Sequence, residues 1–176
     1  AQKPDLTIIN FGMNDQALNG STKKNLTPIH VFESNYRKII EKIQATGSDI
    51  ILVAVHDVYS KQYGGGSPVY NGVDEKGVTY VDRYNEVVKR LAEEYKVGFL
   101  DINSLIENDL QFITVDGIHL NEAGQNRYFK FISDYCYEYV APDYVDTNDV
   151  NNEEADGSNG ILPVVIIIPF ICLCVA

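Results

Sequence analysis

The chain contains 176 residues, of which 45% are hydrophobic, and it carries a formal net charge of −11 at pH 7. A chain of this length builds one domain with a hydrophobic core and is too short for two comfortable ones. The acidic balance argues against nucleic acid as a partner, because phosphate backbones are bound by clustered Lys and Arg.

Three short apolar runs predict buried β-strands. Residues 6–11 are rich in β-branched side chains and end at Gly12, and residues 49–55 are apolar on both faces. A third run covers residues 97–101. Strands that are apolar on both faces are typical of a parallel sheet covered by helices.

Three amphipathic helices alternate with these strands. Thr27-Pro28 favours a helix start, with Thr as the cap and Pro in the first helical position, and Gly47 favours the end of that helix. Apolar side chains recur at helical spacing in this segment and in two later ones. The three stripes are Phe32, Tyr36, Ile39, Ile40 and Ile43; Val81, Tyr84, Val87, Val88, Leu91 and Tyr95; and Tyr128, Ile132, Tyr135 and Tyr139. Alternating strands and helices predict an α/β sandwich with right-handed crossovers.

The composition changes after residue 140. Residues 1–140 are predicted to fold, residues 141–160 to form a solvated acidic linker, and residues 161–176 to form a hydrophobic tail. The tail falls slightly short of the roughly 20 apolar residues that cross a membrane as a helix. It is either a transmembrane helix cut off by the end of the sequence or an anchor signal for a glycolipid, preceded by Gly157 and Ser158. An artefact or a core-packing segment is the remaining alternative, and the acidic linker that separates tail from domain disfavours a core role.

The tail predicts attachment to a membrane, and with it an extracellular or cell-surface location. Two glycosylation acceptor triplets, at Asn19 and Asn25, fit an extracellular domain, although such triplets are common by chance.

Asp116 and His119 are the first candidate catalytic pair. A carboxylate three residues before a histidine, on a loop that opens a helix, can reach the imidazole Nδ1 and set its tautomer. Nε2 can then accept a proton from a hydroxyl nucleophile. On its own the pair is weak, because a capping Asp beside a surface His has the same spacing. A metal site is not expected, because no third ligand has the spacing that zinc requires.

Asn14 is the next candidate. It follows Gly12 in the sequence Gly-Met-Asn-Asp at the carboxyl end of the first predicted strand, the end where ligands bind in open α/β sheets. Gly12 lets the backbone turn tightly, and the Asn14 amide can donate to a developing oxyanion. The alternative is a plain turn residue.

Together these motifs resemble the SGNH (GDSL-like) hydrolase family. Gly-x-Asn-Asp after an apolar strand and, further along, Asp-Gly-x-His-Leu-Asn-x-x-Gly are similar to the third and fifth sequence blocks of that family. The similarity covers residues 4–137 in the family's order. It implies a three-layer α/β/α sandwich with a parallel sheet, incomplete at the N-terminus, and a Ser-His-Asp triad.

The resemblance implies a role for each candidate residue. Asn14 would be an oxyanion-hole donor, His119 the general base and later the general acid, and Asp116 the residue that orients His119. Gly12 and His56 would contact substrate, and the alternative for His56 is a half-exposed loop histidine without a role. No metal or organic cofactor is implied.

The family's nucleophile lies in an N-terminal Gly-Asp-Ser block that has no counterpart in residues 1–176. We therefore expect the nucleophilic serine to lie outside this chain. Two strands with their helices would also be absent, the sheet edge where they belong would be exposed, and residues 1–176 alone would be inactive.

The expected activity of the whole protein is hydrolysis of a carboxylic ester through a serine acyl-enzyme. A small ester, a glycan ester or a lipid would be the substrate, and short-acyl or carbohydrate acetyl esters are favoured. The rival hypothesis is a non-catalytic, membrane-tethered surface protein that binds a glycan or a protein partner. The presence of Asn14, Asp116 and His119 weighs against it, because a binding module has no need of an oriented base.

Overall fold

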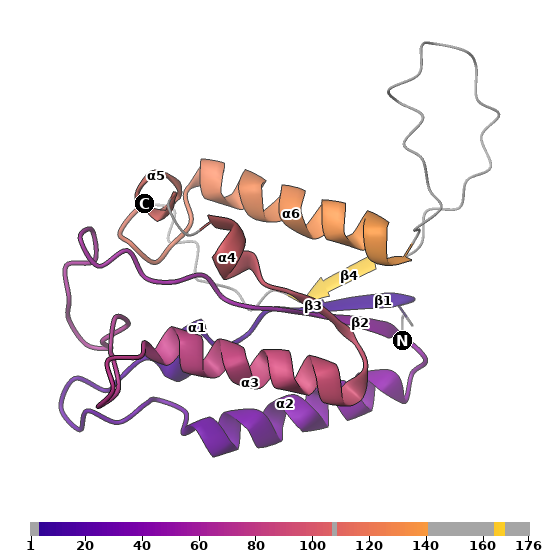
Figure 1. Cartoon of the computed structure of the whole chain (residues 1–176), viewed down its shortest axis with the longest axis horizontal. Coiled ribbons are helices and arrows are strands. Elements are labelled where there is room, and N and C mark those ends of the chain that lie inside the picture. Colours follow the sequence, from indigo (N-terminus) through magenta and orange to yellow (C-terminus); the bar gives the residue numbers. More distant parts are fainter. Residues whose placement is uncertain (1–3, 107–108, 141–163, 168–176) are drawn as a thin grey trace, which may run out of the picture.

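The computed structural model describes residues 4–106, 109–140 and 164–167. These residues form a parallel sheet covered by helices on both faces, which confirms the predicted α/β/α sandwich (Figure 1). In chain order the elements are β1 (Leu6–Ile9), α1 (Met13–Gln16), α2 (Ile29–Gln44), β2 (Asp49–Val53), α3 (Tyr80–Tyr95), β3 (Gly98–Leu100), α4 (Ile102–Ile106), α5 (Leu110–Ile113), α6 (Glu122–Val140) and β4 (Val164–Ile167).

The sheet has the strand order β3-β2-β1-β4, and every pair is parallel. The pairing of β1 with β2 begins at Leu6 and Asp49, and that of β2 with β3 begins at Ile51 and Gly98. Because the strands are parallel, their carboxyl ends all lie at the same end of the sheet. The segments that follow β1 and β2, and the loop between α5 and α6, all lie at this end (Figure 1).

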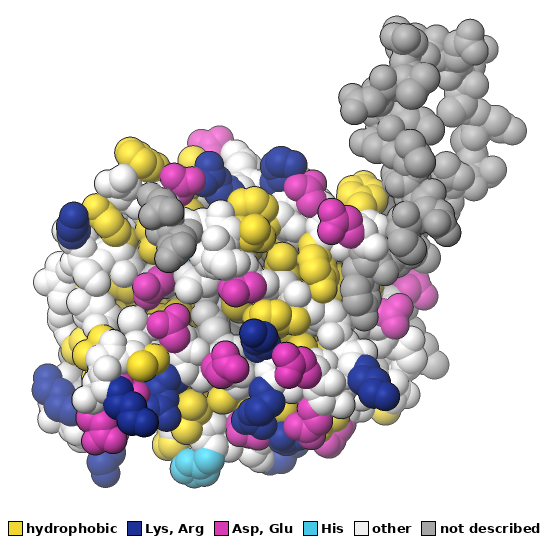
Figure 2. Space-filling model, viewed as in Figure 1, with side chains coloured by type: hydrophobic (Ala, Val, Ile, Leu, Met, Phe, Trp, Pro, Cys, Tyr) yellow, Lys and Arg dark blue, Asp and Glu magenta, His cyan; other side chains and the backbone are white. Residues whose placement is uncertain are grey.

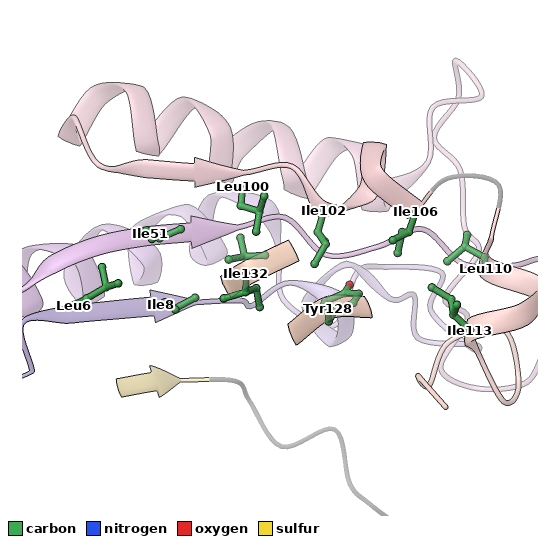
Figure 3. Packing of buried hydrophobic residues seen from close by; sticks show 11 residues of the cluster. Leu6, Ile8, Ile51, Leu100, Ile102, Ile106, Leu110, Ile113, Tyr128 and Ile132 are labelled. Carbon is green, nitrogen blue, oxygen red and sulfur yellow. The ribbon is translucent and has the colours of Figure 1, made fainter. Parts of the chain in front are cut away.

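Strand side chains alternate between two hydrophobic cores. Figure 3 shows the first core, in which strand residues meet Tyr128 and Ile132 of α6 and apolar side chains of α4 and α5. The second core lies between the sheet and the helices α2 and α3. Ile51 belongs to the first core and Ile50 to the second. The predicted strands are apolar on both faces because both faces are covered, and each buried aliphatic side chain contributes about 1.5–3 kcal/mol.

Helices α2 and α3 pack through aromatic rings near the sheet and through ion pairs at the surface. The ring centroid of Phe32 lies 5.0 Å from that of Tyr84. Further out, Arg37 and Arg90 both form ion pairs with Glu33, at 2.9 and 2.8 Å. Figure 2 shows basic and acidic side chains intermingled over this part of the surface.

Two details of the predicted helices differ from the structure. Pro28, not Thr27, is the N-cap of α2, because the Thr27 N–H donates to Asp15 O at 3.1 Å and its carbonyl accepts the Tyr84 hydroxyl. The segment between β3 and α6, predicted to be turns, contains α4 and α5. These helices have five and four residues, which is too short for a helical period to show in the sequence.

Only four residues of the predicted hydrophobic tail are among the described residues. Residues Val164–Ile167 form β4, which pairs in parallel with β1. All four residues of β4 are β-branched, and the strand lies between Pro163 and Pro169. Such a segment suits a short strand better than a helix, since β-branched side chains favour strands and proline interrupts helices. As a result both edges of β1 are paired, where an exposed sheet edge had been expected.

The predicted acidic linker, residues 141–160, lies outside the described residues. Among the helices of the described segments, none combines the length and the apolar character needed to cross a membrane.

Candidate active site

Asp116 and His119 lie together on the turn between α5 and α6. The carboxylate Oδ2 of Asp116 is 2.7 Å from the imidazole Nδ1 of His119, while its Oδ1 accepts the backbone N–H groups of Ile118 and His119 at 3.0 and 2.8 Å. The turn is closed by the Val115 N–H, which donates to the His119 carbonyl at 2.8 Å. The carboxylate therefore holds both the backbone and the ring of His119.

The charge on Asp116 is stabilised by the same contacts. Partial burial acts to raise the pKa of this carboxyl, but hydrogen bonds from the backbone and ring of His119 and from the Ile118 N–H outweigh it and lower the pKa. Asp116 is therefore ionised at neutral pH and accepts a hydrogen bond from the Nδ1–H of His119. In the described part of the chain Nε2 of His119 has no hydrogen-bond partner, and the side chain is 47% exposed, so Nε2 can meet an incoming group.

Gly117 allows this turn to sit against the loop that follows β2. Its φ of +87° lies in the left-handed region, and a Cβ at this position would lie 2.6 Å from Tyr59 O and 2.8 Å from Tyr63 N. Only glycine fits this backbone conformation and this close approach without a shift of the backbone.

Asn14 lies on α1, directly after β1. Gly12, with φ +133°, makes the turn between them, and its carbonyl accepts the Gln16 N–H at 3.0 Å. The Asn14 side chain is exposed, and its Oδ1 accepts the Tyr70 hydroxyl at 2.9 Å. Its Nδ2 has no partner among the described residues, so the amide N–H groups are free to donate to a ligand.

The structure brings the two motifs together. Met13, the neighbour of Asn14, and Ile118, the neighbour of His119, belong to the same buried cluster as Val55 and Val58. Both motifs thus flank one small core at the carboxyl end of the sheet, and an amide donor and an oriented imidazole open from it to solvent.

The structure places both Gly12 and His56 inside the protein. Gly12 is buried and acts through its backbone as the turn after β1. His56 is only 2% exposed and packs edge-on against Tyr128, with ring centroids 5.7 Å apart. The half-exposed position given as the alternative for His56 is wrong, because its side chain turns inward onto α6. A contact with substrate stays a prediction for Gly12 and His56.

The buried imidazole of His56 is kept neutral. Burial lowers its pKa and the nearby His119 acts in the same direction, whereas the hydrogen bond with the Asp57 carbonyl opposes them. Its Nδ1 lies 2.7 Å from Asp57 O. His56 therefore borders the candidate site from inside the protein.

The loop that follows β2 supplies residues that no sequence motif singled out. The Tyr59 N–H donates to Gly117 O at 2.9 Å, and Gln62 Nε2 donates to Val115 O at 2.8 Å. Tyr70 from the same loop reaches Asn14. The available signal was the repeated tyrosine (Tyr59, Tyr63 and Tyr70) in a glycine-rich stretch.

Within the described segments, no group of three or more His, Cys, Asp or Glu side chains could hold a metal ion. The site as described consists of a carboxylate, an imidazole and an amide.

A family model described as the GDSL-like lipase/acylhydrolase family matches residues 1–127. No curated protein matches the chain in sequence.

Several solved structures share the fold. An acetylxylan esterase from Geobacillus stearothermophilus is 21% identical with a TM-score of 0.57, and the match covers 76% of this chain and 59% of that one. A GDSL-like lipase from Bacteroides thetaiotaomicron is 17% identical with a TM-score of 0.54, covering 74% and 61%. An alpha/beta hydrolase from the metagenome of Lake Arreo is 18% identical with a TM-score of 0.57, covering 76% and 60%. The chain thus spans about three-fifths of the length of these structures.

Proposed function

Because the chain belongs to the GDSL-like lipase/acylhydrolase family, we propose that it carries the general base and an oxyanion donor of a serine ester hydrolase. The observation that carries this proposal is the 2.7 Å contact between Asp116 Oδ2 and His119 Nδ1, which leaves Nε2 exposed as a base. An imidazole held in this tautomer is what a hydroxyl nucleophile needs for activation.

The proposed reaction uses each side chain at a stated atom. Nε2 of His119 takes the proton of a serine hydroxyl as the serine oxygen attacks the ester carbonyl carbon. The carbonyl oxygen becomes an oxyanion, which Asn14 Nδ2 stabilises by donating a hydrogen bond. His119 then gives the proton to the alcohol as the ester C–O bond breaks, which leaves an acyl-serine. A water molecule, deprotonated by His119, attacks the acyl carbon, and His119 returns this proton to the serine oxygen as the acid leaves.

The nucleophilic serine is proposed to come from a part of the protein outside residues 1–176. Two observations support this: the chain spans about three-fifths of the length of the hydrolases that it resembles in fold, and His119 Nε2 has no hydroxyl partner among the described residues. Residues 1–176 alone are then expected to show no esterase activity.

Short acyl esters, including acetyl esters of carbohydrates, are the proposed substrates. The support is the similarity in fold to an acetylxylan esterase and the polar character of the groups around His119. A glycan ester is bound through hydroxyl groups, for which exposed amide, hydroxyl and carboxylate groups are suitable partners.

The test is covalent labelling of the full-length protein with a fluorophosphonate, which reacts with an activated serine. His119→Ala should label roughly 10²-fold more slowly or worse, because the general base is lost. His30→Ala, on the exposed start of α2, is the matched control and should label like the wild type. Equal rates for wild type and His119→Ala would reject His119 as the base. A wild type that never labels would favour the non-catalytic binding protein.

A further inference from the structure

We propose that Tyr70 is a positioning residue for the oxyanion donor: its hydroxyl donates to Asn14 Oδ1 and thereby turns Nδ2 toward the substrate. This inference rests on the function proposed above, and it concerns a residue in the loop between β2 and α3 that has no part in the triad.

The argument begins with the symmetry of an asparagine side chain. Rotating the amide by half a turn exchanges Oδ1 and Nδ2 with almost no change in shape, so packing alone does not select one orientation. Asn14 is exposed, and solvent water bonds equally well to either group. If Oδ1 faced the reacting carbonyl, it would repel the developing negative charge instead of stabilising it.

Tyr70 removes this ambiguity. Its hydroxyl donates to Asn14 Oδ1 at 2.9 Å, so the amide oxygen is occupied by the phenol. Both hydrogens on Nδ2 then remain available, as an oxyanion donor requires. The phenol also keeps its proton at neutral pH, because burial and the neighbouring Tyr63 and Asp116 raise its pKa.

Tyr70 is itself held in place from several directions. Its ring packs against the buried cluster that contains Met13 and Ile118, and it meets the ring of Tyr63 edge-on, with centroids 6.0 Å apart. Its carbonyl accepts a hydrogen bond from Gln16 Nε2 at 3.1 Å, and Gln16, the last residue of α1, is fully buried. The hydroxyl is thus presented from a fixed support.

The same loop also holds the other half of the site. Tyr59 and Gln62 bond to the turn that carries Asp116 and His119, while Val69 exchanges backbone hydrogen bonds of 2.8 Å in both directions with Leu18, just after α1. One loop therefore spans from the general base to the oxyanion donor, and Tyr70 is the point at which it touches the amide.

A double-mutant cycle in the full-length enzyme tests the proposal, with p-nitrophenyl acetate as substrate. Tyr70→Phe removes only the hydroxyl and should lower kcat about 5- to 10-fold, the effect of one hydrogen bond, with KM within about 2-fold. Asn14→Ala should lower kcat roughly 10²-fold or more. In the Asn14→Ala background, Tyr70→Phe should cause no further loss, because the amide that it positions is gone.

Tyr95→Phe is the matched control, since its hydroxyl, at the end of α3, donates to Glu41 Oε1 at 2.8 Å and not to the amide of Asn14. It should leave kcat within about 2-fold of wild type. Side-chain NH2 signals of Asn14 in ¹H–¹⁵N spectra give a readout that needs no activity. Tyr70→Phe should shift or broaden them, and Tyr95→Phe should not.

The outcomes separate the two proposals. Two results would overturn the role of Tyr70 and leave the hydrolase mechanism intact. One is an unchanged kcat in Tyr70→Phe, and the other is a fold-loss in kcat from Tyr70→Phe that is the same in the wild-type and Asn14→Ala backgrounds. Unchanged kcat in Asn14→Ala would overturn the oxyanion assignment, and with it the reason to position that amide. Unaltered Asn14 amide signals in Tyr70→Phe would overturn the positioning contact whatever the activity.

Discussion

At the scale of single residues, one carboxylate organises the candidate base. Asp116 accepts the backbone N–H groups of Ile118 and His119 and contacts the imidazole, so it shapes the turn and sets the tautomer at the same time. Because these contacts stabilise the ionised form and lower the pKa of Asp116, they also contribute to folding stability.

The Asp116→Asn variant separates these effects through their pH dependence. A carboxyl whose pKa is lowered by folding stabilises the protein fully above its ordinary pKa of about 4, and this contribution is lost as pH falls through the lower, folded value. The variant should therefore be less stable than wild type at neutral pH, and the difference should shrink below about pH 4. Thermal unfolding measured from neutral to acidic pH checks this. A difference that is constant with pH would show that the contacts do not depend on the charge.

The same variant should also lose activity in the full-length enzyme. The amide NH2 that replaces a carboxylate oxygen can donate to Nδ1, which moves the ring proton to Nε2 and removes the base. We expect kcat to fall roughly 10²- to 10⁴-fold with KM little changed.

At the scale of elements, the turn between α5 and α6 and the loop after β2 support each other. The contact is closest at Gly117, where a Cβ would overlap with the backbone of Tyr59 and Tyr63. Neither segment has a regular hydrogen-bond ladder of its own, so their mutual contacts hold the base in position.

Gly117→Ala tests this contact, and Gly77→Ala is its matched control. Gly77 has φ +80° and open space within 4 Å of the position that a Cβ would take, so its substitution should cost only the left-handed backbone penalty of about 1–2 kcal/mol. Gly117→Ala, at φ +87°, should cost about 1–3 kcal/mol more, because backbone atoms must move. Denaturant unfolding measures both. Equal losses would mean that the two segments can separate without cost.

At the scale of the whole molecule, the sheet is completed by a strand from the far end of the chain. β4 pairs with β1, with Val164 opposite Leu6, so β1 lies between β2 and β4 inside the sheet. β2 is the next strand after β1 in the sequence, whereas β4 is the last of the described strands. A strand with a free edge leaves N–H and C=O groups unpaired and open to other chains.

Hydrogen exchange tests the place of β4. In a parallel sheet the amides of β1 point alternately to its two neighbours, so removing residues 161–176 should speed exchange of those that face β4 and leave those that face β2 protected. Unchanged exchange across β1 would contradict the pairing.

Much of the fold could be predicted, because long elements leave a periodic signal. The central strands and the helices α2, α3 and α6 follow from apolar runs and stripes such as Phe32, Tyr36 and Ile40. The helices α4 and α5 are too short to show a helical period in the sequence. β4 forms because one edge of β1 is open for pairing, and no local sequence pattern reveals that. Asp116 and His119 could be paired from their spacing of three residues, whereas Tyr70 and Asn14 lie in segments whose contact depends on the course of the whole loop.

The sequence by itself determined the layered class of the fold, the order of its main elements and the chemistry of the motifs, because hydrophobic period and local side-chain spacing act over a few residues. Only the tertiary structure decided that His56 turns into the core, that Tyr70 meets Asn14, and that Val164–Ile167 pair with β1. These outcomes depend on which distant surfaces are left to be buried or paired after the main elements pack, and that is a property of the assembled molecule.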